Sequence, residues 1–188
     1  MTIAKESGDY LVNIARKTIS HYFETNEKLP IPDDCPEELK ENLGVFVTLN
    51  ENKELRGCIG YPEPVVPAIE ATINVALSAA FEDPRFNPVT QEEFNNIDIE
   101  VTVLTKPELI IASNPKEILD QIRIGTDGLI VEKGFFRGLL LPQVAPENNM
   151  DEIEFISHTC LKAGIHPKSW VEQDCKIYRF QGQIFSSD

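Results

Sequence analysis

Residues 44–60 read GVFVTLNENKELRGCIG, a stretch in which two short runs of branched apolar residues flank a polar tetrapeptide. The runs are Gly44–Leu49 and Glu54–Gly60, and the tetrapeptide is Asn50-Glu51-Asn52-Lys53. Apolar runs separated by a few turn-forming residues are typical of a β-hairpin. The stretch therefore predicts two adjacent antiparallel strands joined by a short turn.

The second strand of this hairpin carries the residues with the most reactive chemistry. Arg56 and Cys58 are two positions apart, so both side chains are expected on one face of the sheet. Leu55, Gly57 and Ile59 are expected on the opposite face. A guanidinium group beside a thiol favours the thiolate, which is the nucleophilic form of cysteine. Arg56 and Cys58 are therefore candidate catalytic residues.

A second interpretation of the same strand is purely structural. Unpaired cysteine is among the most frequently buried residue types, so Cys58 is also compatible with a place in the core. Gly57 and Gly60 either let a substrate approach the backbone closely or serve a bulge and tight packing. The spacing of the residues does not choose between these two interpretations.

Helices are predicted where apolar residues recur at intervals of three and four. These segments are Ser7–Glu24 with Ser7 as its N-terminal cap, Ile69–Phe81 with Pro67 in its first turn, Asn114–Gln121, and a helix that begins at Asp151 and stops at Gly164. On the last helix His158 lies opposite the apolar stripe, which predicts a solvated side chain and no dyad with Cys160. His166, which precedes Pro167, is also expected to be solvated, and His21 is the remaining histidine of the chain.

Strands are predicted where apolar and polar residues alternate or where short apolar runs end at turn residues. Besides the hairpin, they are Ile97–Val103, Gln121–Gly125, Gly128–Lys133, Phe135–Leu141 and Ile177–Phe185. The segments Lys28–Pro36 and Pro142–Met150 are expected to be a connector and a loop. Trp170 and the pair Phe135-Phe136 are interpreted as packing anchors. The fold class is therefore α+β, with mostly antiparallel sheets and flanking helices.

Composition places the chain among globular proteins. Its 188 residues are 41% hydrophobic and 26% charged, which suits one cooperative unit. The formal net charge is -14, so binding to a nucleic-acid backbone is disfavoured. No apolar run is long enough to cross a membrane, and Met1–Asp9 lacks a signal-peptide core, which predicts a cytoplasmic location. The four cysteines are dispersed, so reduced thiols are expected, and no metal or other cofactor is implied.

Several segments together resemble one known family. The run Leu55-Arg56-Gly57-Cys58-Ile59-Gly60 is similar to the LRGCIG motif of the AMMECR family, named after a chromosomal region linked to Alport syndrome, midface hypoplasia and elliptocytosis. Further segments follow in family order: Ser78–Phe86, Ile99–Leu104, Asp127-Gly128-Leu129 and Gly138–Ala145. The chain is accordingly identified as a member of this family, with the resemblance covering nearly all of it.

The resemblance implies a single domain over residues 1–188 with two lobes and a cleft between them. In that arrangement a larger lobe is built from both chain ends and a smaller lobe from the central part. The resemblance also implies a modification pathway shared with Memo-type and radical-SAM proteins, since related domains are fused to or encoded beside them. It assigns no reaction to the family.

Residues outside the hairpin complete the predicted site. Asp83 and Arg85 are expected to form either a structural ion pair or part of the cleft wall, and Asp83 could bind Arg56 in place of Arg85. The other candidate substrate-binding residues lie in the segments that resemble the family: Phe86, Glu100, Pro142 and Gln143, in addition to Gly57 and Gly60.

Two functions are compatible with these patterns. The first is a cytosolic enzyme that uses Cys58, with Arg56 as an anion binder or thiol activator and a protein or small molecule as substrate. The second is a protein-interaction module without catalytic activity, which uses the LRGCIG surface and the loop at Pro142 for docking. An accessible, reactive Cys58 in a concave site would favour the enzyme, and a flat apolar patch would favour the docking module.

Overall fold

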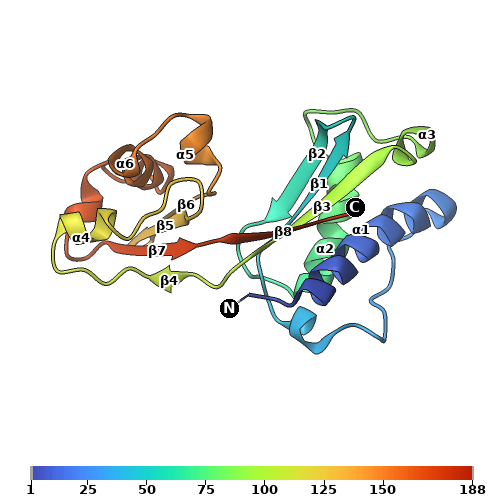
Figure 1. Ribbon diagram of the computed structural model, residues 1–188, viewed down its shortest axis with the longest axis horizontal. Coiled ribbons are helices and arrows are strands. Elements are labelled where there is room, and N and C mark those ends of the chain that lie inside the picture. The colour runs from blue at the N-terminus through green and yellow to red at the C-terminus, as the bar shows by residue number, and fades with distance from the viewer. Residues whose placement is uncertain (1, 188) are drawn as a thin grey trace. The chain divides into compact units, whose positions relative to one another are not determined.

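The hairpin predicted at residues 44–60 forms the edge and the second position of a four-stranded sheet. Strands β1 (Val45–Glu51) and β2 (Glu54–Tyr61) pair in antiparallel fashion, and β1 pairs on its other side with β3 (Ile97–Leu104), also antiparallel. The strand order is β2-β1-β3-β8, where β8 is Gly182–Ser186 (Figure 1). β2 is therefore an edge strand.

The structure is a computed structural model that describes residues 2–187. These residues divide into two compact units. The first contains the described residues up to Thr105 and those from Gln183 onward, and the second is Lys106–Gly182. The predicted single domain and the cleft between its lobes stay predictions.

Two helices cover one face of the first sheet. Helix α1 (Lys5–Thr25) packs against β3, and α2 (Ala68–Phe81) packs against β1 and β2. The alternate residues of β1 and β3 are fully or almost fully buried and form the core with these helices: Val45, Val47, Leu49, Ile97, Ile99, Val101 and Val103. This alternation confirms the amphipathic pattern predicted for β3. A 3-10 helix (Glu37–Lys40) and the short helix α3 (Gln91–Phe94) complete the first unit.

The starts of both long helices differ from the prediction. Ala4, whose side chain makes no capping hydrogen bond, is the N-cap of α1, so the prediction of Ser7 as the cap is wrong. Ser7 lies inside the helix, where its hydroxyl group donates a hydrogen bond to the carboxylate of Glu38. Pro67 is the N-cap of α2 and not part of its first turn.

The second unit is smaller and consists of one sheet with a helix packed on it. Its antiparallel sheet has the order β4-β7-β5-β6, and helix α6 packs against β5 and β6. Its elements are β4 (Glu108–Leu109), α4 (Pro115–Leu119), β5 (Gly128–Lys133), β6 (Phe136–Leu140), α5 (Val144–Glu147), α6 (Glu152–Lys162), a 3-10 helix (Ser169–Val171) and β7 (Lys176–Phe180). The α+β class predicted from the sequence is confirmed in both units.

Some predicted elements of the second unit are wrong. Gln121–Gly125 is a turn and not a strand, because the backbone N–H of Arg123 bonds the buried Asp127 carboxylate instead of a neighbouring strand. Pro142–Met150 contains helix α5. The run Ile177–Phe185 is two strands, since β7 pairs within the second sheet and β8 belongs to the first.

The aromatic residues of the second unit divide between core and surface. Trp170 is buried, in agreement with its predicted packing role. Phe135 is fully exposed and Phe136 mostly so, because they occupy the tip and the first strand position of the β5–β6 hairpin. Their predicted role as packing anchors is therefore wrong.

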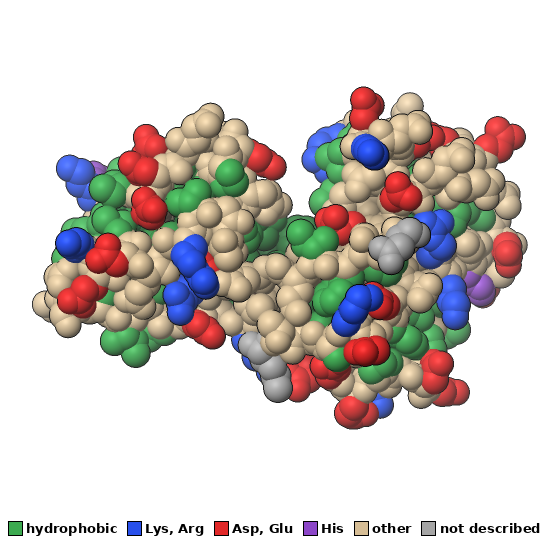
Figure 2. Space-filling view, in the orientation of Figure 1, with side chains coloured by type: hydrophobic (Ala, Val, Ile, Leu, Met, Phe, Trp, Pro, Cys, Tyr) green, Lys and Arg blue, Asp and Glu red, His purple; other side chains and the backbone are tan. Residues whose placement is uncertain are grey.

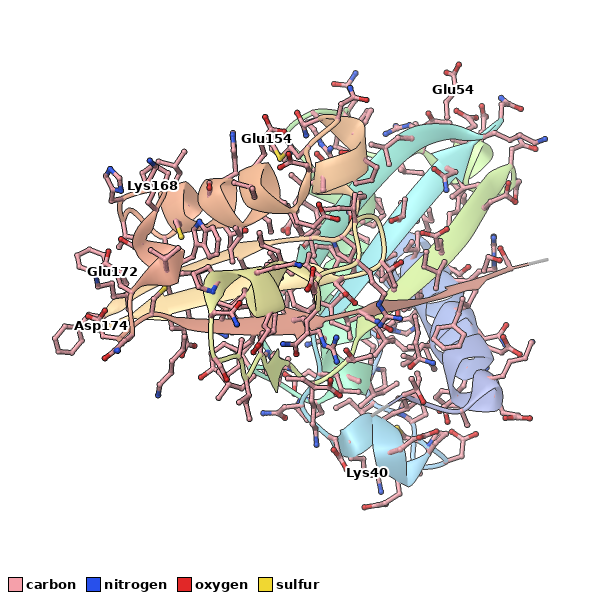
Figure 3. The ribbon with its side chains drawn as sticks, turned by 60° about the vertical axis from the view of Figure 1, so that its left-hand side comes forward. Lys40, Glu54, Glu154, Lys168, Glu172 and Asp174 are labelled. Carbon is pink, nitrogen blue, oxygen red and sulfur yellow. The ribbon has the colours of Figure 1, made fainter. Side chains whose placement is uncertain are left out.

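The chain has a net negative charge, but acidic and basic side chains are interspersed on its surface. In Figure 2 acidic side chains are spread over the visible face with basic ones among them. Lys133 illustrates this, since it forms ion pairs with both Glu172 and Asp174, which lie at one end of the second unit in Figure 3. Within residues 2–187 no helix combines the length and the apolar character needed to cross a membrane.

Candidate functional site

The alternation predicted for the LRGCIG strand is interrupted at Arg56. In the pairing of β1 with β2, Leu49 lies opposite Gly57 and Asn50 lies opposite Leu55, so Arg56 has no partner residue in β1. This is a β-bulge, in which one extra residue shifts the side chains that precede it. Arg56 and Cys58 therefore do not follow the simple two-residue alternation that placed them together.

The two glycines of the motif are required for close packing. A Cβ atom on Gly57 would lie 2.2 Å from the carbonyl oxygen of Ala79, so α2 approaches the strand as closely as it does because Gly57 has no side chain. Gly57 consequently faces the core and not a substrate. A Cβ atom on Gly60 would lie 2.3 Å from the ring of Phe46, which therefore lies across the strand at this glycine.

Cys58 lies on the side of the first sheet that is opposite to the helices. We call this side the thiol face and define it by Phe46, Thr48, Cys58, Glu100 and Thr102. Cys58 is half-buried, and the hydroxyl group of Thr48 donates a hydrogen bond to its sulfur, with 3.3 Å between Oγ1 and Sγ. Thr48 lies directly opposite Cys58 on one side and Glu100 on the other. The three residues form a straight row across three strands.

The main chain of Cys58 is held by an ion pair. Asp83 accepts a hydrogen bond from the Cys58 N–H at 2.9 Å, and Arg85 Nη2 donates to the Cys58 carbonyl oxygen at 3.1 Å. Asp83 and Arg85 also bind each other through Nε at 3.0 Å and Nη2 at 2.7 Å. An edge strand otherwise exposes such backbone groups to unwanted pairing. The ion pair fixes the backbone of Cys58 and covers the edge of the sheet at this point.

The electrostatics of this pair follow from its geometry. The Asp83 side chain is only 2% exposed. Hydrogen bonds from Arg85 hold the pKa of its carboxyl group well below the usual range. Burial opposes this shift, and the hydrogen bond from the N–H of Cys58 assists it. The pKa of Arg85 is raised chiefly by Asp83, and the nearby Cys58 adds to this increase. The guanidinium group beside Cys58 therefore belongs to Arg85.

Arg56 has a different partner from the one predicted. Its Nε and Nη2 atoms donate to the carboxylate of Glu93 at 3.2 and 3.4 Å, and its guanidinium carbon lies 5.9 Å from the centre of the Phe86 ring. Arg56 Nη1 is buried and has no hydrogen-bond partner among residues 2–187. The proposed bond between Asp83 and Arg56 is absent from the described contacts, because Asp83 binds Arg85.

The sequence-predicted residues are thus brought together in part. Phe86 lies beside both guanidinium groups, 5.5 Å from that of Arg85, and Glu100 shares the thiol face with Cys58. Pro142 and Gln143 belong to the second unit, so their participation stays a prediction. His158 is exposed on α6, as predicted. Within the described residues no group of three or more His, Cys, Asp or Glu side chains is placed to hold a metal ion.

Sequence reasoning missed two residues of the site. Thr48 was not recognised because counting the hairpin register outward from its turn pairs it with Gly57, and only the bulge at Arg56 brings it opposite Cys58. Glu93 was not recognised because its helix is only four residues long, Gln91–Phe94. Its sequence signal is a capping box, in which the side chain of Thr90 accepts a hydrogen bond from the N–H of Glu93 while Glu93 binds the N–H of Thr90.

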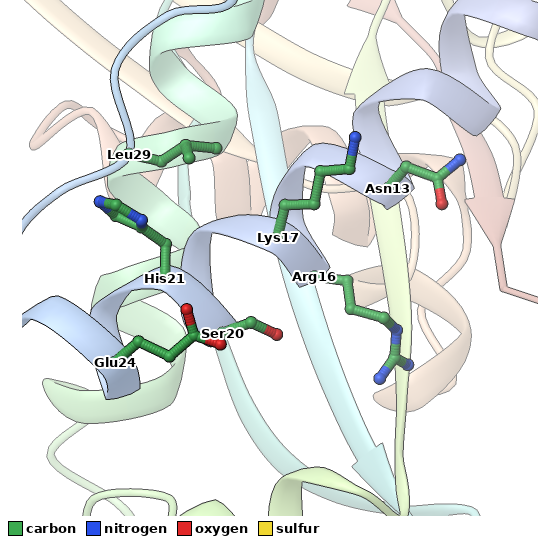
Figure 4. A pocket seen from close by; sticks show the side chains of 7 residues that line it. All are labelled: Asn13, Arg16, Lys17, Ser20, His21, Glu24 and Leu29. Carbon is green, nitrogen blue, oxygen red and sulfur yellow. The ribbon is translucent and has the colours of Figure 1, made fainter.

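A groove along α1 is a separate surface feature. It has a volume of about 520 Å³ and is shown in Figure 4. Arg16 does not point at His21 there; its guanidinium donates to the carbonyl oxygen of Ile97 at 2.6 Å and lies 5.3 Å from the Phe94 ring centre. The remaining polar lining residues include both Lys17 and Glu24. This groove therefore lacks the convergent chemistry that surrounds Cys58.

The fold and the row around Cys58 define an α+β protein with a cysteine on the edge of its first sheet. The sequence matches the AMMECR1 family over residues 12–185. It is 50% identical to a protein of Pyrococcus furiosus over 191 residues, which covers 99% of this chain and 90% of the relative. It is 52% identical to a protein of Methanocaldococcus jannaschii over 182 residues, covering 96% of this chain and 90% of the relative.

The fold has a counterpart among solved structures. The crystal structure of an uncharacterized protein from Pyrococcus horikoshii matches with a TM-score of 0.79 and 49% sequence identity, over 99% of this chain and 94% of that chain. The chain therefore belongs to the AMMECR1 family, as the LRGCIG motif predicted.

Proposed function

We propose that this protein is an enzyme in which the thiolate of Cys58 is the nucleophile. The observation that carries the proposal is the hydrogen bond from Thr48 Oγ1 to Cys58 Sγ at 3.3 Å. A hydroxyl group that donates to sulfur stabilises the thiolate more than the thiol, because the charged form is the stronger acceptor. The guanidinium group of Arg85 adds a positive charge beside the same residue.

The rigidity of the backbone supports a catalytic role. Both main-chain hydrogen-bonding groups of Cys58 are bound by the Asp83–Arg85 pair, so the strand cannot easily shift at this residue. A nucleophile gains from such positioning, since misplacement by about 1 Å can reduce a rate a hundredfold. Arg85 and Asp83 are therefore assigned as positioning residues, and Arg56 is not needed next to the sulfur.

The docking alternative finds less support in the motif itself. Of its apolar residues, Leu55 is 43% exposed, while Ile59 packs against the first core and Gly57 faces α2. A docking surface needs a contiguous apolar patch. The motif presents one exposed apolar side chain and a polar row instead.

The test is alkylation of the native protein by iodoacetamide, with the modified peptide identified by mass spectrometry. We expect Cys58 to react in the folded protein and faster than Cys35 and Cys160, which are buried. Arg85→Ala should slow the reaction at neutral pH, whereas Arg56→Ala should leave its rate within about twofold once folding is confirmed by circular dichroism. If Cys58 reacts only after unfolding, the catalytic proposal is wrong.

A further inference from the structure

Each of the two cations near Cys58 already has a carboxylate partner. Arg85 forms its ion pair with Asp83, and Arg56 forms its ion pair with Glu93, whose side chain is 31% exposed. Both carboxylates have lowered pKa values; that of Glu93 is lowered by the Thr90 N–H first and by Arg56 next. An anionic substrate would therefore have to compete with a bound carboxylate at either arginine.

Glu100, unlike the two arginines, lacks an ionic partner among the described residues. It lies on β3 directly across from Thr48, and within the described part of the chain its side chain forms no hydrogen bond or ion pair. Burial raises the pKa of its carboxyl group, and no neighbouring charge lowers it. A partly buried carboxylate without a partner is costly, because desolvation is not repaid by a compensating contact.

The strands around Glu100 offer no positive charge on the thiol face. The residues that β1 and β3 place on this side include Asn50, Asp98 and Thr102 in addition to Thr48 and Glu100. Strand β8, on the far side of β3, contains no charged residue at all. On β1, β3 and β8 the thiol face therefore carries negative charge and no cation.

An aromatic ring completes this surface. Phe46 lies on β1 two residues from Thr48 and is half-buried, and its ring lies across β2 at Gly60 because a Cβ atom there would collide with it. The ring of Phe46 is thus near the Cys58 end of the row, and Glu100 is at the other end, on β3.

We propose that the thiol face binds a substrate with a cationic group, an ammonium or a guanidinium, held by Glu100 while the reacting atom of the substrate lies at Cys58, on the side where the ring of Phe46 lies. This inference rests on the proposed function of Cys58 and adds the class of substrate. Two interstrand spacings separate the α-carbons of Cys58 and Glu100, about 10 Å. The cationic group and the reacting atom of the substrate are therefore separated by a short chain of atoms lying over Thr48.

The experiment compares three thiol reagents of different charge on the folded protein. They are trimethylammonioethyl, sulfonatoethyl and methyl methanethiosulfonate. With each, the Cys58 thiolate attacks the sulfenyl sulfur, a mixed disulfide forms, and methanesulfinate leaves with the electron pair of the broken sulfur–sulfur bond. The rate at Cys58 is followed by peptide mass spectrometry at low ionic strength, and the neutral methyl reagent measures the intrinsic reactivity of the thiol.

Glu100→Gln is the test variant and Asp98→Asn is the matched control. Both remove one negative charge from the same strand, and Asp98 is exposed and farther from the row. The net charge of -14 favours the cationic reagent everywhere, so only the difference between the variants is informative. From Coulomb's law in water, the cationic-to-anionic rate ratio should fall about fivefold in Glu100→Gln and about twofold or less in Asp98→Asn.

The outcomes separate the two proposals. Unequal effects of the variants, with the larger one at Glu100, support the cation site. If the ratio is unchanged in Glu100→Gln, or falls equally in both variants, the cation site is wrong although Cys58 is reactive. If the methyl reagent also fails to modify Cys58 in the folded protein, the proposed function itself is wrong. Faster reaction with the anionic reagent would assign the dominant charge to Arg85 and also overturn the inference.

Discussion

The carboxylate of Asp83 accepts a hydrogen bond from the backbone N–H of Cys58 at 2.9 Å, although 25 residues separate them in the sequence. Asp83 lies just after α2 and Cys58 lies within β2. The contact therefore ties the end of the helix to the edge of the sheet. Because Arg85 binds the carbonyl group of the same cysteine, the segment after α2 fixes the backbone of Cys58 from both sides.

Removing the charge of Asp83 should destabilise the first unit. In Asp83→Asn one carboxylate oxygen is replaced by an NH2 group, which cannot accept hydrogen bonds from Arg85. We expect the free energy of unfolding to fall by about 2 kcal/mol in urea denaturation at neutral pH, as for other hydrogen bonds to charged groups. Glu82→Gln, at the exposed neighbouring position, should change it by less than about 0.5 kcal/mol. Equal effects would contradict a special role for Asp83.

The same residue predicts a pH dependence. The pKa of Asp83 is lowered in the folded state, chiefly by Arg85, so its stabilisation is fully present above the unfolded pKa of about 3.9. It is lost as the pH falls through the folded value. Between about pH 5 and pH 2 the wild type should therefore lose more unfolding free energy than Asp83→Asn, and the two curves should converge. Parallel curves over this interval would argue against the assignment.

The glycine of the motif that faces α2 should not tolerate a methyl group. Gly57→Ala places a Cβ atom 2.2 Å from the Ala79 carbonyl oxygen, which belongs to the helix backbone and cannot rotate away. We expect a loss of about 2–3 kcal/mol, measured by urea denaturation. Gly134→Ala is the control, because nothing lies within 4 Å of its Cβ position and only its φ of 59° is unfavourable. That variant should lose about 1 kcal/mol.

The hydroxyl group of Thr48 should affect the reactivity of Cys58. Thr48→Val keeps the shape of the side chain but removes the hydrogen bond to sulfur, so alkylation by iodoacetamide at neutral pH should slow about fivefold. Thr48→Ser retains a hydroxyl group and should restore most of the rate. A purely structural role for Thr48 would instead change stability in both variants and leave the rate of Cys58 alkylation unchanged.

The sequence alone determined the local elements around the site. The hairpin, α2 and β3 were predicted because each is specified by residues close together in the chain: a turn between apolar runs, an apolar stripe at helical spacing, and strict alternation in Ile97–Val103. The α+β class follows from the same patterns. The motif around Cys58, together with the further segments in family order, also identified the family that the comparison shows.

Only the tertiary structure decided which side chains meet. The bulge at Arg56 depends on how β2 pairs with β1, and it directs the guanidinium group to Glu93. The division of residues 176–186 between two sheets likewise depends on pairing partners that are distant in sequence. Local spacing cannot report such contacts, because their free energy appears only when remote segments pack together. For that physical reason the chemistry of Cys58 could be suspected from the sequence, while the roles of Thr48 and Arg85 required the fold.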